Sequence, residues 1–296
     1  MATYKRPDGL TALLRSLEVQ EFPEGVELEI VIVDNDPPSA RAAVDAFRAT
    51  SEIPTVYLEQ PEQNISRTRN MSVAGASGEW IWFVDDDEEA EHDCLAELFA
   101  LAMKTDADVV FGDVRPKFEK GTPDWIRSAG VFNRPFPVHG RRSTADRTGN
   151  TLVRRTVLDL EDHPFDEQFG LTGGEDSDLF SRLRRRGVSL RETPLAVVWE
   201  SVSEDRATWP WMVKRCKRLG QLYTGKVLRE NGGSITATPV AIMLAKATAQ
   251  VVATALGSLV VWPNLRLRRR LHQRMWVNIG KLDAARPTSE VGHSWS

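Results

Sequence analysis

One stretch of this sequence carries most of its structural and chemical information: Trp80-Ile81-Trp82-Phe83-Val84-Asp85-Asp86-Asp87-Glu88. Five consecutive apolar residues with aromatics fit a strand buried on both faces, as in the middle of a parallel sheet. Four acids follow directly, and such like charges repel by roughly 1 kcal/mol per close pair even with solvent screening. A divalent cation that holds a diphosphate would offset this repulsion, and a solvated acidic surface turn is the alternative interpretation.

Strand and helix patterns alternate on both sides of this stretch. Apolar spacing predicts helices over 10–17, 40–49, 64–75 and 93–103, and strands over 28–33, 55–58, 109–111 and 149–153. This alternation indicates an α/β fold with a mainly parallel sheet. Between residues 117 and 147 the pattern dissolves into Pro, Gly, Arg and aromatics, which is typical of a long loop that shapes a binding site.

Acidic residues stand where two of these strands end. Asp34 and Asp36 follow one strand, and Asp85 to Asp87 follow another. Ligands of open α/β sheets bind at the carboxyl ends of strands. Separate solvated turns would have no reason to place acids at equivalent ends, so the convergence favours the metal interpretation.

A second acidic segment, Gly173-Gly174-Glu175-Asp176-Ser177-Asp178, leads into a helix. Acids in a first helical turn are stabilised by capping and by the helix dipole, at roughly 0.3–1 kcal/mol each, which is a purely structural explanation. The glycine pair favours a second one, because it lets the backbone approach a ligand closely and hold a carboxylate there as a general base.

Composition sets the class of protein. With 296 residues, 41% of them hydrophobic, and a net charge of −4, we expect one large soluble domain with an appendage and no nucleic-acid partner. The two cysteines, Cys94 and Cys216, are far apart and lack metal-binding spacing, which indicates a reducing compartment. The first thirty residues are polar or amphipathic, so we expect no signal peptide and a cytoplasmic location.

The tail contains an apolar segment over residues 239–262, followed by arginines at 266 and 268–270. Its cleanest part, Ala247 to Trp262, contains Gln250 and Ser258 and is shorter than the roughly 20 apolar residues of a spanning helix. The basic flank favours an anionic leaflet. We expect residues 239–270 to form a membrane-docked or re-entrant helix pair at the inner face of the plasma membrane; a soluble helical hairpin is the alternative.

Five motifs in order resemble those of the family 2 glycosyltransferases, inverting enzymes of the GT-A fold. They are Thr3-Tyr4-Lys5-Arg6-Pro7, Ile32-Val33-Asp34-Asn35-Asp36, Arg69-Asn70, the DXD-like Asp85-Asp86-Asp87, and Gly174-Glu175-Asp176-Ser177-Asp178. The resemblance covers residues 3 to 225. It implies a Rossmann-like GT-A domain over residues 1–225 with a mostly parallel central sheet, and a helical extension over 226–296. The family's opening strand would precede Met1, so we expect the natural start to lie further upstream.

The resemblance also implies roles for individual residues. Asp176 would be the general base, with Glu175 as second choice. Mn²⁺ or Mg²⁺ would be held by Asp85, Asp87 and Glu200, although Glu200 is equally expected to pair with an arginine, since bacterial exopolysaccharide-type members look similar there, with an arginine like Arg206. The donor nucleotide would contact Thr3, Tyr4, Arg6, Asp34, Asp36, Arg69, Asp85 and Asp86.

The implied activity is metal-dependent transfer of a hexose from a nucleotide-diphosphate sugar, most simply a UDP-sugar. The acceptor would be a saccharide or a lipid-linked saccharide of a surface polysaccharide. A nucleotidyltransferase is one alternative, but it would carry a glycine-rich basic loop that Thr3 to Gly9 does not resemble. A non-catalytic carbohydrate-binding protein of the same fold is the other, and it would not need both acidic segments.

Overall fold

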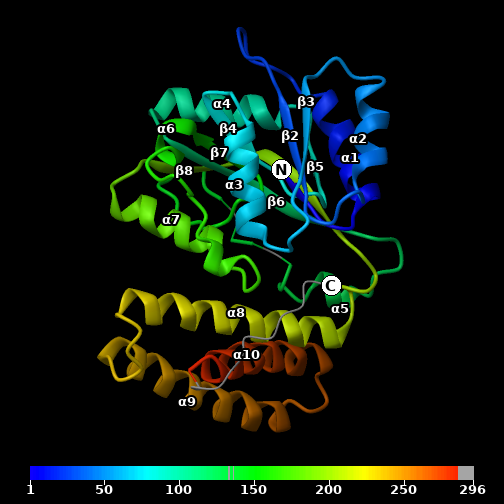
Figure 1. Cartoon of the computed structure of the whole chain (residues 1–296). Helices are drawn as coiled ribbons and strands as arrows, with labels where there is room; N and C mark the ends of the chain where they lie inside the picture. The colour runs from blue at the N-terminus through cyan, green and yellow to red at the C-terminus, as the bar shows by residue number, and fades with distance from the viewer. Residues whose placement is uncertain (133, 136, 286–296) are drawn as a thin grey trace. The chain divides into compact units, whose positions relative to one another are not determined.

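The computed structural model describes residues 1–132, 134–135 and 137–285 (Figure 1). The described chain divides into two compact units: residues 1–117, 134–135 and 137–201 form unit 1, and residues 118–132 and 202–285 form unit 2. The predicted boundary at residue 225 falls inside a single helix, α8 (Trp209–Glu230).

Unit 1 begins with a parallel sheet of three strands, β1 (Ala2–Thr3), β2 (Ile30–Asp34) and β3 (Thr55–Glu59). Every residue of β2 is buried, as expected of its β-branched sequence between two neighbours. Helices α1 (Pro7–Glu18) and α2 (Arg41–Arg48) bury their apolar residues in the same core as β2. Helix α3 (Ile65–Gly75) also packs on β2, and the side chain of Asn64 caps it by accepting from the Arg67 N–H.

Strand β1 pairs in register with the end of β2, Ala2 opposite Val33 and Thr3 opposite Asp34. The α-amino group of Met1 donates to the Val31 carbonyl at 2.7 Å. Burial lowers the pKa of this amine to about 5. The loop that begins at Tyr4 therefore follows the carboxyl end of β1.

A second sheet has the strand order β4-β7-β6-β8-β5. Its strands are β4 (Trp80–Phe83), β5 (Glu88–Ala90), β6 (Val109–Phe118), β7 (Thr151–Arg154) and β8 (Leu190–Val202). Strand β7 pairs antiparallel with β4 and β6, and β5 pairs antiparallel with β8. The α/β fold is confirmed. Fewer strands pair in parallel than predicted, because the parallel pairs lie in the three-stranded sheet and the strand pairs just named in the second sheet are antiparallel.

The prediction that the strand at Trp80 is buried on both faces was wrong. Strand β4 stands at one end of the five-strand order, where Trp80, Ile81 and Trp82 are only partly buried and Phe83 is buried. Trp80 packs edge-on against Phe99 of α4 (Cys94–Thr105), with ring centroids 6.0 Å apart. A run of aromatics can thus form a half-covered strand whose large rings are shielded by a helix on one side.

Helix α7 (Glu175–Arg185) is anchored by its apolar stripe of Leu179, Phe180 and Leu183. The Phe180 ring meets Phe111 of β6 edge-on at 5.0 Å. Each such side chain stabilises the fold by about 1.5–3 kcal/mol through burial. Gly173 and Gly174 precede the helix with φ of 67° and 101°, values that only glycine adopts readily. The core therefore fixes the amino end of α7. Unit 1 also contains the short helix α6 (Arg155–Leu158) and the 3₁₀ helix η1 (Glu167–Phe169), whereas the short helix α5 (Asp124–Arg127) belongs to unit 2.

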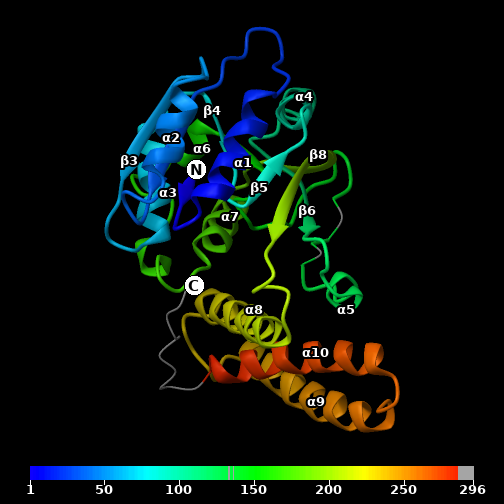
Figure 2. The same cartoon turned by 90° about the vertical axis from the view of Figure 1, so that its right-hand side faces the viewer.

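Unit 2 is mainly helical, with α10 (Leu265–Asp283) lying along both α8 and α9 (Thr238–Val260) (Figures 1 and 2). Helices α8 and α10 touch at glycines: a Cβ at Gly220 would lie 2.0 Å from the Val277 carbonyl oxygen. Among the described residues, α9 alone is long and apolar enough to cross a membrane by length and composition, with a mean hydropathy of 1.6.

Candidate functional site

The Asp86 carboxylate accepts hydrogen bonds from three of the residues predicted to bind nucleotide. One carboxylate oxygen accepts from the Thr3 hydroxyl at 3.0 Å and from the Tyr4 N–H at 3.1 Å. The other accepts from Arg6 at 2.9 Å, and Arg6 also donates to Asp87 at 3.0 Å. Burial raises the pKa of Asp86, and the Arg6 charge opposes that rise. Asp86 thus ties the loop before α1 to the acidic stretch.

Helix α1 comes close to this stretch because position 9 is glycine. A Cβ on Gly9 would lie only 2.4 Å from the carbonyl oxygen of Asp86, nearer than real Cβ contacts occur. The opening loop and the acidic stretch, 80 residues apart in sequence, are therefore held together by backbone proximity as well as by the Arg6–Asp86 ion pair.

Asp34 is fully buried at the end of β2, and its carboxylate organises the turn that follows. One oxygen accepts from the Asp36 N–H at 2.9 Å and the Ser39 hydroxyl at 3.2 Å. The other accepts from the Ala40 N–H and the Tyr57 hydroxyl, both at 2.8 Å. Four accepted bonds fill the acceptor sites of a carboxylate, so the predicted contact between Asp34 and a nucleobase would require one of these bonds to be exchanged.

Asp36 differs from Asp34 in its exposure. Its side chain is 41% exposed, and a carboxylate oxygen lies 3.9 Å from the ammonium of Lys5. The Lys5 ammonium in turn lies 5.0 Å from the Tyr4 ring centroid. These groups stand at the surface next to the Asp86 cluster, where a nucleotide could reach them.

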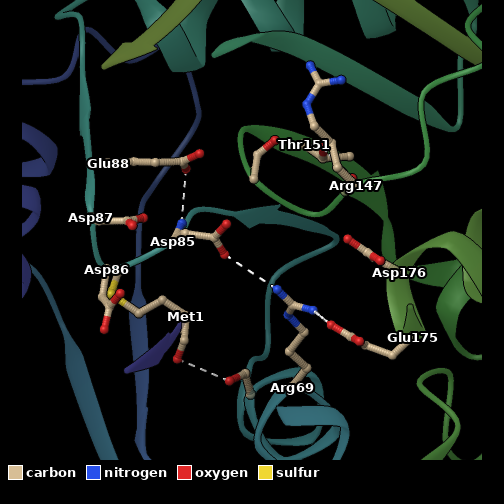
Figure 3. Close-up of polar contacts among 12 residues, drawn as sticks. Met1, Arg69, Asp85, Asp86, Asp87, Glu88, Arg147, Thr151, Glu175 and Asp176 are labelled. Atoms are coloured by element: carbon tan, nitrogen blue, oxygen red, sulfur yellow. Dashed lines mark hydrogen bonds and ion pairs between the residues drawn. The ribbon is translucent and has the colours of Figure 1, made fainter. Parts of the chain in front are cut away.

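Arg69 of α3 joins the two acidic segments of the sequence. Its guanidinium donates through Nη1 to Oε1 of Glu175 and through Nη2, at 3.5 Å, to Oδ1 of Asp85 (Figure 3). Glu175 is only 4% exposed, and its second oxygen, Oε2, is buried without a hydrogen-bond partner among the described residues. One buried cation thus links the end of β4 to the start of α7.

Asp176 lies beside Glu175, and its carboxylate accepts from the Ser177 N–H at 2.7 Å. Burial raises the pKa of Asp176 to about 7, the Glu175 charge adds to the rise, and Arg69 opposes it. A carboxylate with a pKa near 7 is suited to accept a proton at physiological pH. Asp178, by contrast, pairs with Arg182 at 2.7 Å within its own helix, as the structural explanation of this segment requires.

Glu200 on β8 lies directly opposite Glu88 on β5 in the antiparallel register. Oε2 of Glu200 pairs with Arg134 at 2.8 Å, so the expected arginine partner is supplied by the long loop. Burial raises the pKa of Asp87 to about 6, and the Glu200 charge adds to the rise. Burial, followed by the Asp85 charge, raises the pKa of Glu88 well above its ordinary value.

These carboxylates have the chemistry of a site for a hard divalent cation, since all their donors are oxygens. Glu88 is 1% exposed, and its Oε1 is buried without a hydrogen-bond partner among the described residues. Burial is the largest cause of the raised pKa values of Asp87 and Glu88, and the charges of Glu200 and Asp85, respectively, add to the rise. In the described part of the chain, however, no three His, Cys, Asp or Glu side chains are grouped closely enough to form a ready metal site. The donor set fits a cation, and the role of Asp85, Asp87 and Glu200 as its ligands stays a prediction.

Sequence reasoning assigned no role to Glu88, Arg134, Arg147 or Gly149. Oε2 of Glu88 accepts from the Asp85 N–H at 3.0 Å (Figure 3), and a Cβ on Gly149 would lie 2.5 Å from Oε1. Burial lowers the pKa of Arg147 to about 10, and the Arg134 charge lowers it further. The signal for the two arginines was the arginine-rich loop over residues 117–147, which has no periodicity that would single out either one.

Comparison with known proteins identifies the family of this chain. The sequence profile of "Glycosyl transferase family 2" matches residues 1–159. The succinoglycan biosynthesis protein ExoM of Rhizobium meliloti (strain 1021) is 34% identical over 295 residues, which cover 98% of this chain and 93% of ExoM. The poly(ribitol-phosphate) beta-N-acetylglucosaminyltransferase TarS of Staphylococcus aureus (strain MW2) is 28% identical over 59% of this chain, a match that spans 30% of TarS.

Solved structures give the same fold. The crystal structure of S. aureus TarS 1–349 in complex with UDP has a TM-score of 0.55 at 18% identity, covering 96% of this chain and 88% of that one. The complex of the same fragment with UDP-GlcNAc has a TM-score of 0.55 at 17% identity, covering 94% and 89%. The profile match and the near full-length likeness to ExoM establish that the chain belongs to glycosyl transferase family 2.

Proposed function

We propose that this chain is an inverting glycosyltransferase that moves a hexose from a UDP-sugar, with Mn²⁺ or Mg²⁺, to a saccharide or lipid-linked saccharide of a surface polysaccharide. The UDP and UDP-GlcNAc complexes of TarS support the choice of donor nucleotide. The name of ExoM, a succinoglycan biosynthesis protein, supports the polysaccharide acceptor. Synthesis from a nucleotide-sugar donor would take place on the cytoplasmic side of the membrane.

The observation that carries the proposal is the bridge made by Arg69. Inverting transfer needs a diphosphate site and a general base close together in space, on opposite sides of the reacting anomeric carbon. Arg69 contacts Asp85 of the acidic stretch and Glu175 beside Asp176 (Figure 3). Segments 90 residues apart in sequence are thereby brought to the two ends of one guanidinium.

Asp176 is the base in this mechanism. Its carboxylate takes the proton from the acceptor hydroxyl while that oxygen forms a bond to the anomeric carbon. The bond from that carbon to the diphosphate breaks on the opposite face, and its electron pair leaves with UDP. Arg69 holds Glu175 in place beside the base, and Arg6 holds Asp86 and Asp87.

A divalent cation held by Asp85, Asp87 and Glu200 would supply neutralisation of the charge that develops on the leaving diphosphate. Its ligands would be carboxylate oxygens, as Mg²⁺ and Mn²⁺ prefer. Thr3, Tyr4 and Arg6 would contact the nucleotide from the loop that Asp86 already holds in place.

An assay of UDP release tests the proposal. The purified chain is incubated with a panel of UDP-sugars and GDP-sugars in Mn²⁺ or EDTA, and we expect slow, EDTA-sensitive hydrolysis of one donor. Asp176→Asn should abolish transfer and retain donor binding, and Asp178→Asn serves as the matched control because Asp178 pairs within its own helix. Undiminished transfer by Asp176→Asn would refute the assignment of the base.

A further inference from the structure

Helix α9 presents its larger apolar side chains outward. Its buried residues are Val240, Ala247, Thr254 and Ser258, which share one face of the helix and are small or polar apart from the valine. The Thr254 hydroxyl donates to the Gln250 carbonyl at 2.6 Å, and Ser258 donates to Ala255 at 2.7 Å, so both are satisfied within the helix. A helix of a water-soluble protein is expected to show the reverse pattern.

The opposite face forms a continuous apolar strip. Its residues follow helical spacing and lie about half a turn away from Thr254 and Ser258. We call this strip, together with Trp262 in the turn that follows the helix, the α9 outer face: Val252 (54% exposed), Leu256 (59%), Leu259 (64%), Val260 (83%) and Trp262 (64%). Single exposed apolar residues are ordinary, but contiguous ones mark an interaction site.

Arginines of α10 follow this face in the chain, and one of them contacts it. Arg266 and Arg270, four residues apart on α10, are both exposed, as are Leu265 and Leu267 beside them. The guanidinium of Arg268 lies 4.4 Å from the ring centroid of Trp262. Tryptophan beside arginine at the edge of an apolar strip is the composition of a helix that lies in a membrane interface.

We propose that the α9 outer face docks into the interfacial layer of a membrane rich in anionic lipid. The acyl region would take the leucines and valines, and the arginines would reach the phosphate groups. A second copy of this chain fits the surface less well. An isologous contact would set the arginines of both copies at the same interface, where like charges repel.

Helix α9 would lie in the plane of the membrane instead of crossing it. Its inner face packs against α10, which carries five arginines. A crossing α9 would draw this charged helix into hydrocarbon, at a cost that the exposed strip could not offset. In-plane docking leaves α10 on the aqueous side and immerses only the outer face.

Co-sedimentation of the full-length protein with vesicles tests the proposal without any glycosyl donor. Wild type should bind vesicles with about 30 mol% phosphatidylglycerol in phosphatidylcholine, bind pure phosphatidylcholine much more weakly, and be released by salt. Failure of wild type to bind the anionic vesicles at low salt would overturn the proposal, whatever its transferase activity.

Two double variants locate the surface. Leu256→Ser with Leu259→Ser should weaken vesicle binding at least about tenfold, and Arg266→Gln with Arg270→Gln by roughly 25-fold. The matched controls are Leu160→Ser with Leu195→Ser, which are 53% and 50% exposed in unit 1, and Arg142→Gln with Arg185→Gln, which should bind as wild type does. Equal binding by the surface variants and their controls would place the contact elsewhere and refute the proposal.

Sedimentation velocity without lipid tests whether the α9 outer face instead binds a second copy of this chain. Monomeric wild type that binds anionic vesicles supports the membrane proposal. A wild-type dimer that dissociates on Leu256→Ser with Leu259→Ser, together with no vesicle binding, would assign the surface to a second copy and overturn it.

Discussion

Replacing Arg69 by methionine should destabilise unit 1 far more than replacing its neighbour Arg67. Both arginines belong to α3, and each bridges two acids. Arg69 reaches Asp85 and Glu175 with its side chain 11% exposed, and the side chain of Glu175 is 5% exposed. Arg67 reaches Glu62 and Glu167 with side-chain exposures of 36%, 68% and 39%, so water already solvates that cluster. The two sites therefore share their chemistry and differ in burial.

The magnitude follows from what each substitution leaves behind. Arg69→Met leaves the buried Glu175 carboxylate without its ion-pair partner, and its Oε2 already has no hydrogen-bond partner in the described part of the chain. Removing one partner of a buried ion pair costs about 3–5 kcal/mol. Arg67→Met leaves acids that water can solvate, so its effect should be small. A double variant, Arg69→Met with Glu175→Leu, removes the stranded charge and should recover most of the loss.

Urea unfolding followed by tryptophan fluorescence measures these differences, with Trp80, Trp82 and Trp199 as reporters in unit 1. For a slope of about 2 kcal/mol per M, Arg69→Met should lower the midpoint by roughly 1.5–2.5 M. Equal shifts for Arg69→Met and Arg67→Met, or no recovery in the double variant, would show that the bridge is not a buried ion pair of the kind described.

Three further outcomes are expected. Asp176→Asn should raise the melting temperature more at pH 8 than at pH 5, by about 2–4 °C for each kcal/mol of stability gained. The pKa of Asp176 in the folded protein, about 7, lies above its unfolded value, so the wild-type protein loses stability as the pH rises through 7 and this carboxyl ionises. An equal change in melting temperature at both pH values would contradict this. Glu175→Gln should retain transfer and move the acidic limb of kcat/KM to lower pH, because the Glu175 charge helps to raise the pKa of Asp176; an unmoved limb would exclude Asp176 as the titrating base. Gly149→Ala should lower the free energy of unfolding by about 1–3 kcal/mol and sharply reduce transfer, because the added Cβ would lie 2.5 Å from Oε1 of Glu88 and 3.0 Å from Oδ2 of Asp85. Gly257→Ala is the control in a thermal melt, since its Cβ would meet only Leu271, at 3.4 Å. Similar melting temperatures for the two variants would count against a crowded carboxylate pocket.

Local patterns in the sequence predicted the elements that local physics controls. The leucine stripe of α1, the Asn64 cap of α3 and the glycine pair before α7 each specify their helix within a few residues. Strand pairing was less predictable, because β5 meets β8 and β4 meets β7 across long sequence separations. A run of aromatic residues does not record whether its neighbours run parallel or antiparallel.

The candidate site, like the fold, was predictable from the sequence only in part. The sequence singled out Asp85, Arg69 and Glu175, and the structure joins these three. It could not reveal that the acceptor sites of Asp34 are filled by the turn that follows it and by the Tyr57 hydroxyl, since an aspartate that caps a turn and one that binds a base have the same local pattern. Arg134 stands in an aperiodic loop, and only the folded chain brings it to Glu200. In α9, composition predicted an apolar helix, whereas packing decided which face turns outward.

The placement of Glu88 opposite Glu200 gives a practical route to the unknown donor. Around this pair of strands the charge of Glu200 raises the pKa of Asp87, and the charge of Asp85 raises the pKa of Glu88, so acids repel one another at this end of the second sheet. A divalent cation bound there would relieve this repulsion, and a nucleotide bound with it at 100 times its Kd would stabilise the folded protein by about 2.7 kcal/mol. A thermal-shift screen of sugar nucleotides with and without Mn²⁺ can therefore identify the donor before any acceptor or product is known.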